Sequence, residues 1–429
     1  MKPSNFAKLN DLGLKLWNEG KRKEAFEVFL DAVTRFPENA TAHSNLAFMF
    51  LRGGALDESR AHYETALKLD PKHADARRGL ATVLAQLGKT PNATELREIA
   101  GSDNAIMTLP FRGAGTPIRI LLLVSLGSGN LQIEGLLDDQ VFATTKLVVE
   151  LFPPDRELPP HDLIFNGIGD ADSGEDALRV AERLLANVAA ELLVNAPARV
   201  LQTTRMENAE RLRELDGVIT ARTRLIPSRD AAAALEREGF AFPLLLRSPG
   251  HHTGHHFELI PDSAALPAAL ASLPGDRLYA LEYIDFRSAD GKFRKYRVMF
   301  VDGGLYPLHI AVSANWKVHY FSADMAEVPE HRAEDERFLD DMADVLGGRA
   351  IGALGKIAAA LALDYAGIDF ALSADGRVVV FETNATMVVV EPAAEERWAY
   401  RRAPVQRVRE AVRRMLVERA SQRQAAQRP

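Results

Sequence analysis

Hydrophobic and polar positions repeat with a period of 34 residues through the first hundred residues. The same kinds of residue return at fixed places: leucine, glycine, an aromatic residue, alanine and proline. The coinciding pairs are Leu12 and Leu46, Gly20 and Gly54, Phe29 and Tyr63, Ala32 and Ala66, and Pro37 and Pro71. A fixed period of 34 residues predicts that each repeat forms one pair of helices. Such a pair cannot bury its apolar face alone, so successive pairs stack on one another. An unrelated helical bundle is the alternative, but it would not reproduce one period at so many positions.

Small residues mark one helix contact in three successive copies, at Gly13, Ala47 and Ala81. Together with the proline after the second helix, this pattern resembles the tetratricopeptide repeat (TPR) family. The third copy loses the pattern after Ala93. We therefore expect two and a half repeats in an all-α TPR domain over residues 1–100, with a small curved surface.

The rhythm changes after residues 101–116, where glycine, proline and small polar residues predict a linker. Ile118 to Val124 has strand length and is aliphatic except for Arg119, which favours a buried parallel strand. We expect further strands at His161–Asn166 and Leu192–Asn195, with a helix over Glu175–Glu191 between them. Strand and helix alternate in this way in Rossmann-like α/β folds.

Composition and charge narrow the class of protein. Hydrophobic residues make up 47% and charged residues 26% of the 429 positions, which are ordinary globular values. The formal net charge of −7 gives no global attraction to nucleic acid. The absence of cysteine excludes disulfides and thiol catalysis and fits a reducing compartment. The N-terminus lacks a signal-peptide pattern and the longest apolar stretch is too short to span a bilayer, so we expect a cytoplasmic protein that binds neither nucleic acid nor membrane.

The strongest candidate chemistry lies in a predicted β-hairpin near the C-terminal end. Its first strand contains Asp369, a turn follows at Asp375-Gly376, and its second strand carries Glu382 and Asn384. The hairpin would bring Asp369 beside Glu382, and residues two apart on a strand share a face. Two carboxylates and an amide oxygen suit Mg²⁺ shared with phosphates. An edge hairpin with its charges facing water is the alternative.

These residues resemble the ATP-grasp superfamily, whose members carry an Asp on one strand and a Glu-x-Asn on the next. The resemblance implies an α/β (α+β) ATP-grasp fold with a Rossmann-like preATP domain. It also implies ATP and Mg²⁺ as cofactors, with Asp369, Glu382 and Asn384 as metal ligands. The predicted domains are residues 1–100 (TPR module), 101–116 (linker), 117–200 (preATP-grasp domain), 201–420 (ATP-grasp domain, with a lid over 205–282 and a C-terminal lobe over 283–420) and 421–429 (tail).

Two upstream segments resemble the phosphate-binding passages of that family. In the first, Arg247 would stand near the α- and β-phosphates, and the loop that contains Gly250 and Gly254 would close over the nucleotide. The second segment comes earlier in the chain. There, Asn195-Ala-Pro197 and Thr203-Thr204-Arg205 resemble the asparagine-proline-proline and Asp-x-Lys passage of the family. Arg205 and Arg247 both replace a lysine, and arginine keeps the charge while it can hold phosphate bidentately. Four histidines in the loop, His251, His252, His255 and His256, leave a zinc site as an alternative to contact with phosphate or substrate.

The same resemblance assigns a hinge that receives adenine through backbone groups. Its residues would be Glu282, Tyr283 and Ile284. Lys295 stands where many relatives have an acid for the ribose, so that contact would move to Asp285 or Asp290.

Three residues are predicted to act on the transferred phosphate. Arg297 occupies the place of the family arginine that steadies transferred phosphate and acylphosphate. Lys317 and His319 are two apart, hence on one face if extended, and could meet the γ-phosphate or the acceptor. A surface turn is the alternative for this pair.

The C-terminal segment predicts an amphipathic helix with a basic face. Val405, Val408, Val412 and Leu416 recur at helical spacing, and ten arginines lie between Arg397 and Arg428. We expect this helix to dock onto the ATP domain with its arginine face in solvent.

The resemblance implies a carboxylate–amine ligase that works in two steps. A carboxylate attacks the γ-phosphate of ATP to give an acylphosphate and ADP, and an amine then displaces phosphate to form an amide. A phosphotransferase on the same fold and a non-catalytic TPR adaptor with a structural ATP site are the alternatives.

The partners implied are ATP, a carboxylate substrate and an amine acceptor. We expect a peptide or carrier-linked substrate that docks in the repeats. The rival uses of the repeats are formation of a homodimer and recruitment of an unrelated partner. Three large residues on or near the inner face of the repeats would bind such a peptide or would pack between helices: Trp17, Phe48 and Leu51.

Overall fold

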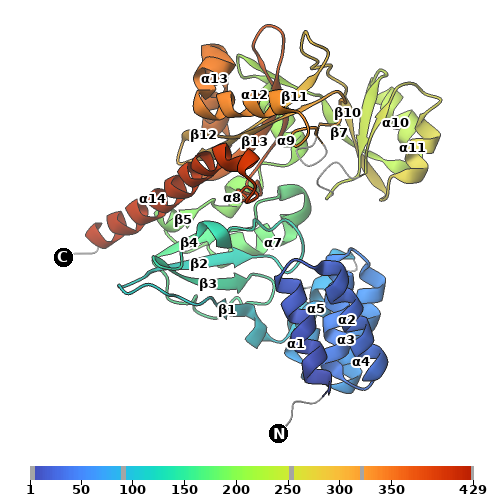
Figure 1. Cartoon of the computed structure of the whole chain (residues 1–429), viewed down its shortest axis with the longest axis vertical. Coiled ribbons are helices and arrows are strands. Elements are labelled where there is room, and N and C mark those ends of the chain that lie inside the picture. Colours follow the sequence, from blue (N-terminus) through green and yellow to red (C-terminus); the bar gives the residue numbers. More distant parts are fainter. Residues whose placement is uncertain (1–4, 88–92, 251–255, 319–322, 427–429) are drawn as a thin grey trace. The chain divides into compact units, whose positions relative to one another are not determined.

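The computed structural model describes residues 5–87, 93–250, 256–318 and 323–426, and Figure 1 draws the whole chain. The chain divides into two compact units. Unit 1 comprises Met1–Thr108, Val124–Ser128 and Thr145–Leu158, and unit 2 comprises Leu109–Leu123, Gly129–Thr144 and Pro159–Pro429. Within the described ranges, no helix is both long and apolar enough to cross a membrane.

Unit 1 consists mainly of helices, which Figure 1 shows in blue. They are α1 (Asn5–Asn18), α2 (Arg22–Arg35), α3 (Ala40–Arg52), α4 (Leu56–Leu69), α5 (Ala74–Gln86) and α6 (Ala93–Ala100). The predicted all-α repeat domain is therefore confirmed. The short strand β1 (Ile106–Thr108) follows and pairs antiparallel with β3 (Phe142–Val148), with Ile106 opposite Leu147.

Small residues allow the helices of unit 1 to approach closely. A Cβ added to Gly13 would lie 2.5 Å from Cε1 of Phe29, and Ala47 and Ala81 are fully buried, as predicted for one contact position. Larger side chains at these positions would force the helices apart. Trp17 and Phe48 meet edge to face, with ring centroids 5.0 Å apart, so both take part in packing between α1 and α3.

Unit 2 begins with three neighbouring parallel strands. Strand β4 (Leu163–Asn166) lies between β2 (Ile118–Val124) and β5 (Leu193–Val194) and is parallel to both. The predicted bounds of β2 are confirmed, and its aliphatic residues from Ile120 to Leu123 are all buried, which suits a strand that is covered on both faces. Helix α7 (Ala171–Leu184) starts earlier than predicted, since the Asp170 side chain accepts a hydrogen bond from the Asp172 N–H and caps the helix there.

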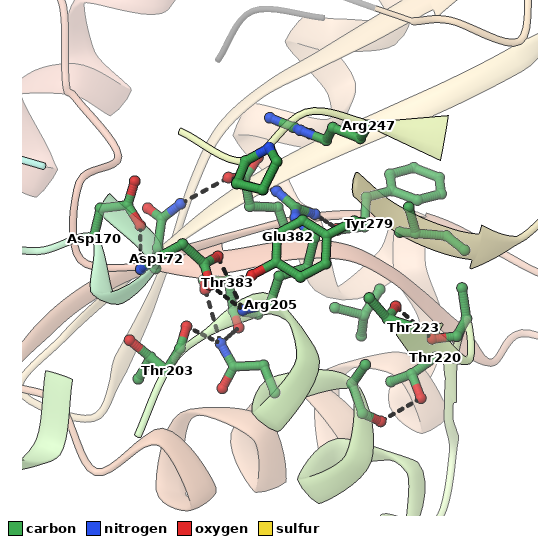
Figure 2. Close-up of a pocket in the computed structure, with 18 of the residues that line it drawn as sticks. Asp170, Asp172, Thr203, Arg205, Thr220, Thr223, Arg247, Tyr279, Glu382 and Thr383 are labelled. Atoms are coloured by element: carbon green, nitrogen blue, oxygen red, sulfur yellow. Dashed lines mark hydrogen bonds and ion pairs between the residues drawn. The ribbon is translucent and has the colours of Figure 1, made fainter. Parts of the chain in front are cut away.

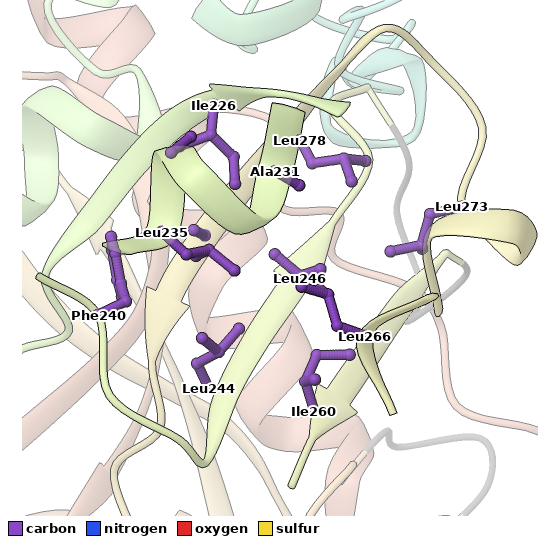
Figure 3. Close-up of a cluster of buried hydrophobic side chains, with 12 residues drawn as sticks. Ile226, Ala231, Leu235, Phe240, Leu244, Leu246, Ile260, Leu266, Leu273 and Leu278 are labelled. Atoms are coloured by element: carbon purple, nitrogen blue, oxygen red, sulfur yellow. The ribbon is translucent and has the colours of Figure 1, made fainter. Parts of the chain in front are cut away.

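A second sheet forms a small lobe with its own core (Figure 3). Its strand order is β7-β10-β8-β9, and all neighbours are antiparallel. Two helices cover it and bury leucine and alanine side chains against the sheet. The elements are β7 (Thr223–Pro227), α10 (Ala231–Arg237), β8 (Leu244–Arg247), β9 (Phe257–Ile260), α11 (Leu266–Ser272) and β10 (Arg277–Glu282).

The third sheet carries the predicted hairpin. Its strand order is β12-β11-β13-β14-β6, and only the β14–β6 pairing is parallel. The strands are β6 (Val218–Thr220), β11 (Phe293–Val301), β12 (Gly304–Ser313), β13 (Tyr365–Leu372) and β14 (Val378–Asn384). The helices of this region are α8 (Pro197–Val200), α9 (Arg205–Arg213), α12 (Pro329–Asp340), α13 (Met342–Leu361) and α14 (Arg402–Ala426).

The predicted C-terminal helix is confirmed as α14, and its valines at 405, 408 and 412 are buried. Several of its arginines do not simply face solvent. Arg407 donates to the backbone oxygen of Leu339, and Arg423 donates to the backbone oxygens of His161 and Asp162. The arginines thus help to hold the helix against unit 2.

Asn195 joins the end of β5 to the start of β13. It adopts a left-handed backbone with φ of 56° and is 1% exposed. Its side-chain oxygen accepts from the N–H groups of Asp364 and Tyr365, both at 2.9 Å, and its amide nitrogen donates to the Tyr365 oxygen at 2.7 Å. This residue, which resembled a phosphate-binding passage in the sequence, therefore serves as a structural connection between two sheets of unit 2.

Candidate active site

An open cavity of about 680 Å³, including solvent at its mouth, lies in unit 2 (Figure 2). Its wall combines residues from α7, α9, β8, β10 and β14. Apolar Leu281 and Val380 form part of the surface. The charged and amide-bearing residues that line it are Asp170, Asp172, Arg205, Asn208, Arg247, Glu382 and Asn384.

Arg205 stands at the base of this cavity, at the first position of α9. The Thr204 side chain caps the helix by accepting from the N–H of Glu207. The Arg205 guanidinium donates through Nη1 to the Phe381 oxygen at 2.9 Å, and Nη2 lies 3.1 Å from Oε1 of Glu382. Burial alone would lower the pKa of Arg205, but the charges of Glu382 and Asp172 raise it above its ordinary value. Arg205 is therefore a fixed cation.

Asp172 links three elements around the cavity. Its carboxylate accepts a hydrogen bond of 2.6 Å from the Tyr279 hydroxyl on β10 and one of 3.1 Å from the backbone N–H of Arg205 on α9. Burial raises the pKa of Asp172, although the Tyr279 hydroxyl and the Arg205 charge act against this rise. Burial, with the neighbouring Asp172 charge, also raises the pKa of Tyr279, so its hydroxyl stays protonated and remains a donor.

Arg247 provides a second cation, which lies above Arg205 in the view of Figure 2. Arg247 is the last residue of strand β8 and is 9% exposed. Its guanidinium carbon lies 5.5 Å from the centre of the Phe257 ring. Burial, followed by the nearby charge of Arg205, lowers the pKa of Arg247 to about 10, which still leaves it protonated at neutral pH. The cavity thus has two permanent cations, each on a different element.

Asp369 lies opposite Arg297 in the β11–β13 register and opposite Glu382 in the β13–β14 register. Arg297 donates to it through two nitrogens of its guanidinium, with Nε 2.6 Å from Oδ1 and Nη2 2.8 Å from Oδ2. Lys295 Nζ lies 3.0 Å from the same Oδ2. Burial alone would raise the pKa of Asp369, but the charges of Arg297 and Lys295 hold it well below its ordinary range. The carboxylate is therefore ionised and enclosed by two cations.

Glu382 and Asn384 face the cavity from the same side of β14, as the sequence predicted from their spacing. Asn384 donates to Oε1 of Glu382 at 3.0 Å, and its side-chain oxygen accepts from the Thr386 N–H and hydroxyl at 3.0 and 2.9 Å. The structure therefore brings all three predicted metal ligands together, but only Glu382 and Asn384 line the cavity.

The predicted hinge lies at the edge of this site. Glu282 accepts from the Arg222 N–H through its carboxylate, its own N–H donates to the Arg222 oxygen, and the two side chains form an ion pair at 3.2 Å. Ile284 packs against an apolar cluster around Phe286. Leu281, directly before these residues, lines the cavity, whereas Glu282, Tyr283 and Ile284 do not.

The remaining predicted residues fall in different places. Gly250 lines the cavity with a left-handed φ of 73°. Lys317 donates to the Phe257 oxygen of β9 at 2.8 Å and so contacts the small lobe. The prediction for Gly254 and His319 lies outside the described residues, as does the zinc alternative at His251, His252 and His255.

Sequence reasoning missed Asp172 and Tyr279 as part of the site. They are 107 positions apart and resemble no motif together. A signal was present for one of them, because Asp170 and Asp172 follow a short apolar strand and open a helix, where acidic residues are favoured. Nothing in the spacing of Tyr279 pointed to Asp172.

Comparison with protein families identifies the repeats of unit 1. Residues 10–64 match the family described as tetratricopeptide repeat, and residues 49–88 match the one described as TPR repeat. Residues 10–88 therefore carry tetratricopeptide repeats, as the period predicted. No curated protein matches the sequence.

Solved structures show a distant likeness. The D-alanine–D-alanine ligase from Bacillus anthracis complexed with ATP is 14% identical, with 73% of this chain and 100% of that chain covered and a TM-score of 0.43. A RimK domain ATP-grasp protein from Sphaerobacter thermophilus DSM 20745 is 16% identical, with coverage of 70% and 99% and a TM-score of 0.38. The ATP-grasp ligase PsnB, complexed with precursor peptide PsnA2 and AMPPNP, is 12% identical, with coverage of 71% and 99% and a TM-score of 0.41. We argue the function from this chain's own residues.

Proposed function

We propose that this chain is an ATP-dependent ligase that joins a carboxylate to an amine through an acylphosphate. The observation that carries the proposal is the convergence of Arg205, Arg247, Glu382 and Asn384 on one cavity from three separate elements. Two fixed cations beside a carboxylate and an amide suit a nucleotide triphosphate with its metal ion. The resemblance of these residues to the ATP-grasp pattern supports the same assignment.

Arg205 and Arg247 would bind the phosphates. Arg205 is held by Phe381 and Glu382, and Arg247 stands over Phe257, so both cations are oriented before the nucleotide arrives. Preorganised charge is the main requirement of phosphoryl transfer, which needs alignment and neutralisation more than covalent help. The apolar surface of Leu281 and Val380 would accept the base.

Mg²⁺ fits the cavity-facing part of the predicted ligand set. Glu382 supplies a carboxylate and Asn384 an amide oxygen, which are the hard donors that Mg²⁺ takes while it keeps phosphate and water ligands. To ligate the ion, the Asn384 oxygen would give up its bond from the Thr386 hydroxyl. When bound, the ion would neutralise phosphate charge and orient the γ-phosphate.

The chemistry then has two balanced steps. A substrate carboxylate oxygen attacks the γ-phosphorus, the bond to the ADP oxygen breaks, and an acylphosphate forms. An amine nitrogen attacks the acyl carbon, phosphate leaves with the bonding electrons, and the nitrogen loses a proton to solvent. Arg297 donates to Asp369, and Asp369 lies opposite Glu382 on the neighbouring strand. Arg297 is the proposed stabiliser of the transferred phosphate.

The test is ADP release in the presence of ATP and Mg²⁺, screened over amino acids, short peptides and peptides encoded beside the gene, with products analysed by mass spectrometry. We expect a product whose mass equals the two reactants less one water. A phosphorylated product would indicate a phosphotransferase, and failure to bind ATP would contradict the proposal. Glu382→Gln should be folded and inactive, which controls for a contaminating enzyme.

The proposed substrate is a peptide or carrier-linked chain that docks on the repeats. Helix α1 exposes Leu14 at 45% of its surface, one turn before Trp17, whose ring meets the 36% exposed Phe48. Docking there would raise the effective concentration of the reacting end at the active site. We expect Leu14→Ser to raise KM for the peptide with kcat and ATP affinity unchanged. Leu30→Ser, on α2 and 44% exposed, is the matched control. Equal KM in both variants would rule out docking on this face.

A further inference from the structure

Lys295 and Arg297 occupy alternate positions of β11, so both side chains project to the same face of the sheet. Asp369 lies directly opposite Arg297 on β13 and its carboxylate is contacted by both cations. The Asp369 side chain is only 4% exposed. Its oxygens thus have three contacts with cationic nitrogens, at 2.6, 2.8 and 3.0 Å.

Glu382 differs from Asp369 in its access to the cavity. It lines the cavity together with Asn384, and its side chain is 24% exposed. Glu382 forms an ion pair with Arg205, whereas Asp369 forms ion pairs with both Lys295 and Arg297. Two facing carboxylates can hold two metal ions a few ångströms apart, each at one carboxylate. In this chain, however, the position beside Asp369 already contains an ammonium group.

A divalent ion at Asp369 would face strong repulsion. It would lie within contact distance of the Lys295 ammonium and the Arg297 guanidinium in a buried setting, where solvent screens charges poorly. Lys295 itself provides a positive charge beside the hairpin without any metal. We infer that Lys295 takes the place of a second divalent cation at Asp369, so that the cavity binds a single Mg²⁺ with each nucleotide, through Glu382 and Asn384. This inference rests on the proposed function, because it concerns the metal that accompanies ATP.

The test counts metal ions directly. Mn²⁺ is titrated into the full-length protein with saturating AMPPNP, and free Mn²⁺ is measured by electron paramagnetic resonance. We expect one bound Mn²⁺ per nucleotide for the natural chain and two for Lys295→Met, which removes the charge and keeps an apolar chain of similar length. Lys295→Arg, which retains the charge, should bind one.

Lys356→Met is the matched control. Lys356 forms an ion pair with Asp216 at the same 3.0 Å distance, and neither residue lines the cavity, so this variant should bind one ion. Two ions bound to the natural chain, or one ion bound to folded Lys295→Met, would overturn the inference. If Lys295→Met fails to fold, the counts for the natural chain and Lys295→Arg decide the question. Absence of AMPPNP binding is a different result, which refutes the proposed function and the inference with it.

Discussion

Replacing Asp369 by asparagine should destabilise unit 2 strongly, because the substitution removes the charge that compensates two cations. The Asp369 side chain is 4% exposed, and its contacts are the paired guanidinium bonds of Arg297 and the ammonium of Lys295. Asparagine keeps the shape but turns a donor toward one of these cations. Removal of one partner from a buried ion pair typically costs about 3–5 kcal/mol, and we expect a value in this range.

The assay is thermal unfolding followed by tryptophan fluorescence. The chain has three tryptophans, and Trp17 is the one in unit 1, so a Trp17→Phe background leaves Trp316 and Trp398 as reporters of unit 2. At roughly 2 °C per kcal/mol for a domain of more than 150 residues, the midpoint should fall by about 6–10 °C. The comparison uses midpoints, because a chain with two units need not unfold in one step.

Two controls separate this effect from a general loss of charge. Asp216→Asn breaks an exposed ion pair with Lys356, whose two side chains are 83% and 48% exposed, and should leave the midpoint unchanged. Glu382→Gln, at a partly exposed position, should cost less than Asp369→Asn while it abolishes activity.

The dependence on pH supplies a further check. The cations lower the pKa of Asp369, so its stabilising charge is present above the ordinary carboxyl range and is lost only as pH falls through the lowered value. The difference between the variant and the natural chain should therefore stay constant from pH 5 to 8. An Asp369→Asn midpoint within about 2 °C of the natural one, which corresponds to roughly 1 kcal/mol, would refute the reasoning.

Three further predictions follow from the other contacts. Arg247→Ala should raise the Kd for ATP by about 10–150-fold in calorimetry, since a hydrogen bond to a charged group contributes about 1.5–3 kcal/mol, and the exposed Arg237→Ala in the same lobe should leave the Kd unchanged. Burial raises the pKa of Asp172, so the free energy of unfolding falls as pH rises from the ordinary carboxyl pKa through the raised one. Tyr279→Phe removes a hydrogen bond that lowers this pKa. The variant should therefore show a larger fall in melting midpoint between pH 4 and 8 than the natural chain does. Asn195→Ala should lower the midpoint as much as Asp369→Asn, because the two buried backbone groups of Tyr365 lose their partner at about 1–3 kcal/mol each, and the half-buried Asp364 N–H loses it as well. An unchanged midpoint would show that solvent replaces those bonds.

Local patterns in the sequence predicted local structure well. The strand Ile118–Val124 could be placed from its aliphatic run, the repeats from their period, and the partnership of Asp369 with Glu382 from a turn and a two-residue spacing. Each of these rests on residues close together in the chain or on one repeated unit.

Contacts between distant segments could not be predicted in the same way. Arg297 and Asp369 are 72 positions apart and Asp172 and Tyr279 are 107 apart, so no spacing relates them. The hinge shows the same limit, because the Glu282 carboxylate binds Arg222, 60 positions earlier, and does not line the cavity. The resemblance predicted which charged residues belong to the site, but the strand register determines which of these charges form ion pairs.

The use of arginine instead of lysine at 205 follows from what this side chain must contact. One nitrogen of Arg205 donates to the Phe381 oxygen while another meets Glu382, and the planar guanidinium can do both at once because its donors diverge from a rigid plane. A lysine has a single ammonium on a flexible stem, and it would hold Glu382 without fixing the backbone of β14. The cavity therefore gains an oriented carboxylate as well as a cation from the same residue. At Asp369, two cations hold one carboxylate, so the negative charge that would attract a metal ion is already more than neutralised. The two carboxylates of the hairpin thus differ in their surroundings: Glu382 lines the cavity, whereas Asp369 is enclosed by cations of the protein itself.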